Sequence, residues 1–232
     1  PEATPDHVID LKWPFLREYP DLSSKRGTSF DYTDLLVWDT ENVAGISRRV
    51  NRLLGINNSN RRDLSSGEEG LYALEHILLR PRPGDAYQLG PLMFGVQEAD
   101  PYSNQISYIL SDNGRFASSG GDLKKYTSQL LRAETPAHIL INIYWLSGVA
   151  LEDWEIAYRE FLQALAVTPV YDQVLGSDHQ FPLRIARDRL FDLMYAIDPV
   201  NALGIPYPIK DLPLPARITA EQTDPIGSPD DW

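Results

Sequence analysis

The stretch of residues 100–165 constrains the fold of this chain most strongly, because its apolar residues change twice from strand spacing to helical spacing. Residues 106–110 are mostly β-branched, aromatic or aliphatic and precede Asp-Asn-Gly at 112–114, which predicts a strand that ends in a turn. A helix capped by Asp122 should follow and should end before Pro136, which lacks a backbone N–H. Its apolar positions are Leu123, Tyr126, Leu130 and Leu131.

A second strand and a second helix complete this pattern. Residues 139–146 are almost continuously apolar, as is typical of a strand covered on both faces, and we expect it to be the central strand. The helix after it has one apolar face, formed by Trp154, Ala157, Tyr158, Phe161, Leu162 and Leu165. We therefore predict an α+β fold, in which a small sheet has its helices packed on one face.

The composition divides the chain into three predicted segments. Residues 1–66 hold an irregular, Pro-rich N-terminal arm and an arginine-rich helix, residues 67–170 the α+β core domain, and residues 171–232 a helix and a Pro-rich C-terminal tail. Within the core domain, residues 71–80 are apolar and short, so they do not distinguish helix from strand. We expect helix in the first part of this run and strand toward residues 77–79.

A cationic patch is predicted on the helix at residues 42–54, where apolar residues recur at helical spacing before Gly55. The arginine patch consists of Arg48, Arg49, Arg52, Arg61 and Arg62. Guanidinium groups bind carboxylates in two-point geometry, so the arginine patch is a candidate docking site for an acidic partner surface. The alternative is an ordinary helix face whose arginines pair with nearby Asp and Glu, as exposed charge runs usually do.

The two arms supply further candidate partner contacts. Their exposed Pro-aromatic character is typical of segments that lie across a partner surface, although such segments also pack on their own domain. The residues in question are Trp13, Phe15, Pro213, Leu214, Pro215 and Trp232. We expect both arms to be held by other polypeptides.

The net charge of −12 argues against non-specific binding to nucleic acid or anionic lipid, since both need a positive field. The absence of cysteine excludes disulfides, thiolate nucleophiles and sulfur metal sites. No apolar run approaches the roughly 20 residues that cross a bilayer, and the first residues do not resemble a secretory signal. We expect a soluble protein and, because the chain begins with Pro1, a processed product or part of a longer polypeptide.

The sequence contains no recognised catalytic motif, so no catalytic residue, metal ligand or cofactor is predicted. Glu75 and His76 are adjacent, but nothing nearby in the sequence supplies a nucleophile, and a structural histidine is expected. The alternative function is a small-molecule or peptide-binding module, or a hydrolase, with its site in the loops around residues 114–121. Such a site would hold two carboxylates, or a carboxylate and His138.

Four short stretches, in this order, resemble a family of large proteins encoded with phage-tail-like contractile injection systems. They are residues 43–56, 69–82, 100–103 and 134–139. The resemblance implies a structural component at or near the baseplate, without catalytic residues, that binds other subunits of a hetero-oligomer. It also implies assembly in the cytoplasm followed by incorporation into a particle. Family members often carry extra sequence between the first two stretches, whereas here a short loop joins them.

Overall fold

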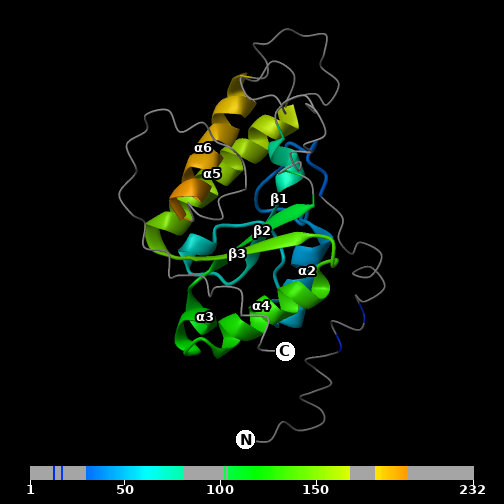
Figure 1. Ribbon diagram of the computed structural model, residues 1–232, viewed down its shortest axis with the longest axis vertical. Helices are drawn as coiled ribbons and strands as arrows, with labels where there is room; N and C mark the ends of the chain where they lie inside the picture. The colour runs from blue at the N-terminus through cyan, green and yellow to red at the C-terminus, as the bar shows by residue number, and fades with distance from the viewer. Residues whose placement is uncertain are drawn as a thin grey trace, which may run out of the picture.

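The computed structural model of the chain describes residues 13, 17, 30–80, 102, 104–167 and 181–197. A three-stranded sheet lies between two layers of helices (Figure 1). Its strands are β1 (Leu71–Glu75), β2 (Gln105–Ser111) and β3 (Leu140–Leu146), in the order β1-β2-β3. β1 runs antiparallel to β2, and β3 runs parallel to β2. The predicted α+β class is confirmed.

β2 is the central strand, and the prediction that residues 139–146 would be central is wrong. β3 pairs with β2 on one side, and no strand of the described residues pairs with its other side. The prediction failed because a continuous apolar run indicates only that the side chains on both faces of the strand are covered. It does not report whether the backbone is paired along both edges.

The helices cover both faces of the sheet, so the expectation that they pack on one face is also wrong. Helices α5 (Gly148–Val167) and α6 (Phe181–Ile197) lie on one side in Figure 1, and α2 (Gly45–Leu53), α3 (Gly114–Ser118) and α4 (Asp122–Glu134) lie on the other. The reason is that successive residues of β2 point to opposite faces, and every residue from Ile106 to Ser111 is buried, so both faces of this strand are covered. Ile109 packs in the core beneath α5 and α6, whereas Tyr108 and Leu110 pack in the core with α2 and α4.

Residues 71–80 reverse the predicted order of helix and strand. The first half is β1, and the second half is a 3₁₀ turn, η2 (His76–Leu79). The first four residues of β1 are buried, because antiparallel pairing with β2 places this strand between the two helix layers. A strand covered on both faces has no alternation in its sequence, so a distant pairing decided its conformation.

Local signals predicted the ends of several helices correctly. Gly55 has φ +73° just after α2, and α4 ends at Glu134, before the extended Thr135 that precedes Pro136. The predicted cap of α4 was one residue off, because Asp122 is the first residue of the helix and Gly121 is its cap. The short helix α3, which follows the predicted turn, was not predicted. A second 3₁₀ turn, η1 (Leu64–Ser66), follows the loop after α2. Among the described helices, none combines the length and the apolar character that a membrane span requires.

Candidate functional site

The fold buries Arg49, one of the five residues of the arginine patch, against another helix of the same chain. Arg49 is 8% exposed and lies on α2, where its Nε donates to Glu134 Oε2 on α4 at 2.5 Å. Its Nη2 donates to the second carboxylate oxygen at 3.3 Å. The two-point geometry expected for a partner carboxylate is therefore formed within the chain, and it joins α2 to α4.

Arg61, a second residue of the arginine patch, is also buried. Its Nη1 donates to the Val37 carbonyl at 2.7 Å, and its guanidinium lies 4.5 Å from the centre of the Phe30 ring. The backbones of Arg61 and Thr40 also form an isolated antiparallel bridge. Arg61 therefore fastens the segment that contains Phe30 and Val37 onto the core beneath α5.

The three remaining arginines of the patch are half-buried and contact neighbours close in sequence. Arg48 donates to the Glu41 carbonyl at 2.8 Å, Arg52 contacts Asn57, and Arg62 pairs with a carboxylate oxygen of Glu68 at 2.9 Å. A partner that binds the arginine patch would thus meet Arg48, Arg52 and Arg62. Of the arm residues, Trp13 is 62% exposed. Phe15, Pro213, Leu214, Pro215 and Trp232 lie outside the described residues.

Glu155 is a buried carboxylate that the sequence reasoning missed. It lies on α5 and accepts hydrogen bonds from the Leu64 N–H at 2.6 Å, the Ser65 hydroxyl at 2.5 Å and the Tyr72 hydroxyl at 2.6 Å. Burial, reinforced by the Glu155 charge, holds the pKa of Tyr72 well above its usual range. Glu155 thereby ties α5 to η1 and β1. Its position inside the apolar face of α5 was the available signal in the sequence.

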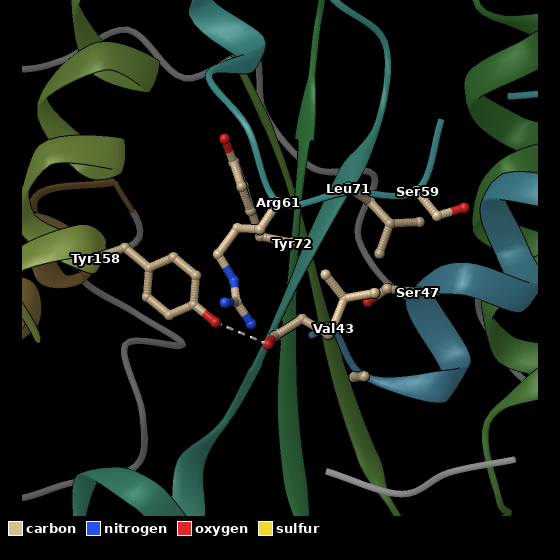
Figure 2. Close-up of a pocket in the computed structure, with 9 residues that line it drawn as sticks. Val43, Ser47, Ser59, Arg61, Leu71, Tyr72 and Tyr158 are labelled. Atoms are coloured by element: carbon tan, nitrogen blue, oxygen red, sulfur yellow. Dashed lines mark hydrogen bonds between the residues drawn. The ribbon is translucent and has the colours of Figure 1, made fainter. Parts of the chain in front are cut away.

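The cavity in Figure 2 is lined by residues of α2, of the loop after it, of β1 and of α5. Its volume is about 10 Å³, which is at most the room that one water molecule needs. Tyr158 points from α5 across this space and donates its hydroxyl to the Ala73 carbonyl at 3.3 Å, beside the Arg61 side chain (Figure 2). The cavity is therefore a packing gap that is too small for a substrate.

His76 and Ser107 form a hydroxyl–imidazole pair, a combination that serves in nucleophilic catalysis when substrate can reach it. His76 Nε2 lies 2.7 Å from Ser107 Oγ, and both side chains are completely buried. Burial lowers the pKa of His76 to about 4, so the imidazole is neutral at pH 7. These features place His76 in the core, out of contact with solvent.

The region around residues 114–121, where the alternative function was expected, is mostly exposed, and Phe116 is its one buried side chain. Phe116 of α3 is buried against the ring of Trp145, and the Arg115 N–H donates to Glu69 Oε1 at 2.7 Å. A Cβ on Gly114 would lie 2.7 Å from the same oxygen, so the backbone approaches Glu69 closely there. His138 is exposed. Within the described ranges, no group of three His, Asp or Glu residues is placed to hold a metal ion.

Helix α4 presents a second set of cations, which the sequence reasoning did not single out. Lys125 and Arg132 are seven residues apart, so they lie on the same face of the helix, and both are exposed. Lys124, in contrast, is partly covered and pairs with Asp112 at 2.7 Å. The described surface therefore has cations on α4 as well as on α2.

No protein-family model matches this chain, and no curated protein matches it either.

Proposed function

We propose that this chain is a non-enzymatic structural subunit that acts through contacts with other proteins, in a phage-tail-like contractile injection particle, at or near the baseplate. The main support for the proposal is that several buried ionisable side chains make hydrogen bonds inside the fold. Glu155, Arg49 and His76 each bind protein groups inside the fold, at 2.5–2.7 Å. Such contacts stabilise a scaffold.

The location of the family-like stretches also supports a structural role. Residues 43–56 contain α2 and the glycine turn that ends it, and residues 69–82 contain β1 and η2. Residues 134–139 join α4 to β3. The resemblance to contractile-particle proteins therefore falls on segments that build the two cores, and it supplies the identity of the particle in this proposal.

Deletion of residues 199–232 tests the predicted assembly role. This deletion starts after α6, so the described elements remain in the shortened chain. We expect the shortened protein to fold with an unchanged circular dichroism spectrum but to be missing from purified particles. Particles that contain it at the full-chain level would contradict the proposed role of the tail.

A pair of charge-matched double variants tests whether the exposed part of the arginine patch binds a partner. Arg48→Ala with Arg52→Ala removes two cations from α2, and Lys125→Ala with Arg132→Ala removes two cations from α4. We expect the first double variant to reduce incorporation into particles at least tenfold and the second to leave it unchanged. Equal losses in both would mean that net charge, and not the arginine patch, governs assembly.

A further inference from the structure

The outer edge of β3 carries backbone hydrogen-bonding groups that point away from the sheet. At the two ends of the strand, the Leu140 N–H donates toward β2 at 2.8 Å and the Leu146 carbonyl accepts from the chain of β2 at 2.7 Å. In a parallel ladder alternate residues bond the same neighbour, so the even-numbered residues of β3 face β2. The odd-numbered residues Ile141, Ile143 and Trp145 direct their N–H and C=O groups outward.

Within β3 itself, three features by which proteins usually block unwanted strand pairing are absent: a charged residue, a proline and a bulge. Its pairing with β2 is regular over all seven residues. Leu140 is 57% exposed, and Ile141, Ile143 and Trp145 are half-buried. An apolar edge of this length is suited to receive another strand through backbone hydrogen bonds.

The sequence of β3 is complementary to itself when two copies run antiparallel. With Ile143 opposite Ile143 of a second copy, Ile141 falls opposite Trp145. Both pairs lie on the face covered by α4, where these three side chains border the apolar core. Pairs of β-branched and aromatic residues across antiparallel strands are favourable. Leu140 falls opposite Leu146 on the other face.

We propose that two copies of this chain pair through their β3 edges, antiparallel and about a twofold axis at Ile143. The two sheets then form one continuous sheet, in which the outward groups of Ile141, Ile143 and Trp145 bond those of the partner copy. The interface is isologous, as a twofold axis requires. This pairing goes beyond the proposed function and does not depend on the identity of the particle.

The mass of the purified full chain in solution tests this pairing. We expect an average mass of about 1.8 times the chain mass of 26.2 kDa by sedimentation equilibrium at about 100 μM, because about four fifths of the chains are paired at tenfold above a Kd of about 10 μM. Ile143→Lys places a charge at the centre of the edge and should give the monomer mass. Ile185→Lys is the matched control, because Ile185 is 52% exposed on α6, and it should stay dimeric. A monomeric wild-type chain, or a dimeric Ile143→Lys chain, would overturn the proposal.

Cross-linking tests the register, independently of the effect of a charge on folding. The chain has no cysteine, so a single introduced cysteine is unique. In Ile143→Cys, the two Cα atoms across the axis would be about 5.5 Å apart, which suits a disulfide. In the control Ile141→Cys, they would be offset by four residues, or about 14 Å. We expect oxidised dimer only from Ile143→Cys. Equal cross-linking of both variants, or none from Ile143→Cys, would refute this register.

Discussion

Burial of His76 makes a quantitative prediction about stability at acidic pH. The imidazole is completely buried, and its pKa falls from about 6.5 to about 4. Above pH 6.5 the imidazole is neutral in both the folded and the unfolded chain. Between pH 6.5 and 4 the unfolded chain binds a proton that the folded chain does not, so the free energy of unfolding decreases as the pH falls.

The size of this decrease follows from the pKa difference. A pKa difference of one corresponds to about 1.36 kcal/mol, so the whole difference between about 6.5 and about 4 amounts to about 3 kcal/mol, which is reached only below pH 4. At pH 5, which is about 1.5 below the pKa of the unfolded imidazole, the free energy of unfolding should be about 2 kcal/mol lower than above pH 6.5. The variant His76→Gln keeps a nitrogen donor that can reach Ser107 but does not titrate.

Urea unfolding of both proteins at pH 7.5, 6 and 5 measures the effect. The wild type should lose about 2 kcal/mol more than His76→Gln between pH 7.5 and 5. Burial raises the pKa of the neighbouring Glu75, so protonation of this carboxylate increases the free energy of unfolding as the pH falls. This effect is opposite in sign to that of His76 and is the same in both proteins. It therefore cancels in the comparison, and Glu75→Gln checks this. Parallel pH profiles for the wild type and His76→Gln would refute the assignment of the acid sensitivity to His76.

Three further substitutions test the buried contacts of the fold. Glu155→Ala should lower the free energy of unfolding by about 3 kcal/mol in urea denaturation, because several buried donors lose their acceptor. Arg49→Ala should cost about 3 kcal/mol because it removes this partner from Glu134, whose side chain is only 13% exposed, and calorimetry should show that Arg49→Met with Glu134→Leu costs much less. Gly114→Ala should destabilise more than Gly120→Ala in thermal melts. Both have positive φ, but only at Gly114 would the added Cβ lie 2.7 Å from a carboxylate oxygen.

The sequence by itself determined the features that depend on neighbouring residues. Periodicity predicted β2 and α5, and the helix over α4 ended where Pro136 required it. Gly55 took the positive φ expected after α2. These signals are reliable because helix spacing, proline geometry and glycine conformation act within one or two turns of chain.

Only the tertiary structure decided which strands pair with each other and which side chains are buried. β1 became a strand because β2 pairs with it across about thirty residues, and β3 became an edge because no described strand lies beyond it. The burial of Arg49 and Arg61, two residues of the arginine patch, likewise followed from contacts with distant segments. The sequence around a helical arginine does not show whether its side chain faces water or pairs with a carboxylate from a distant segment. Pairing and burial are properties of the assembled chain, so local patterns do not encode them.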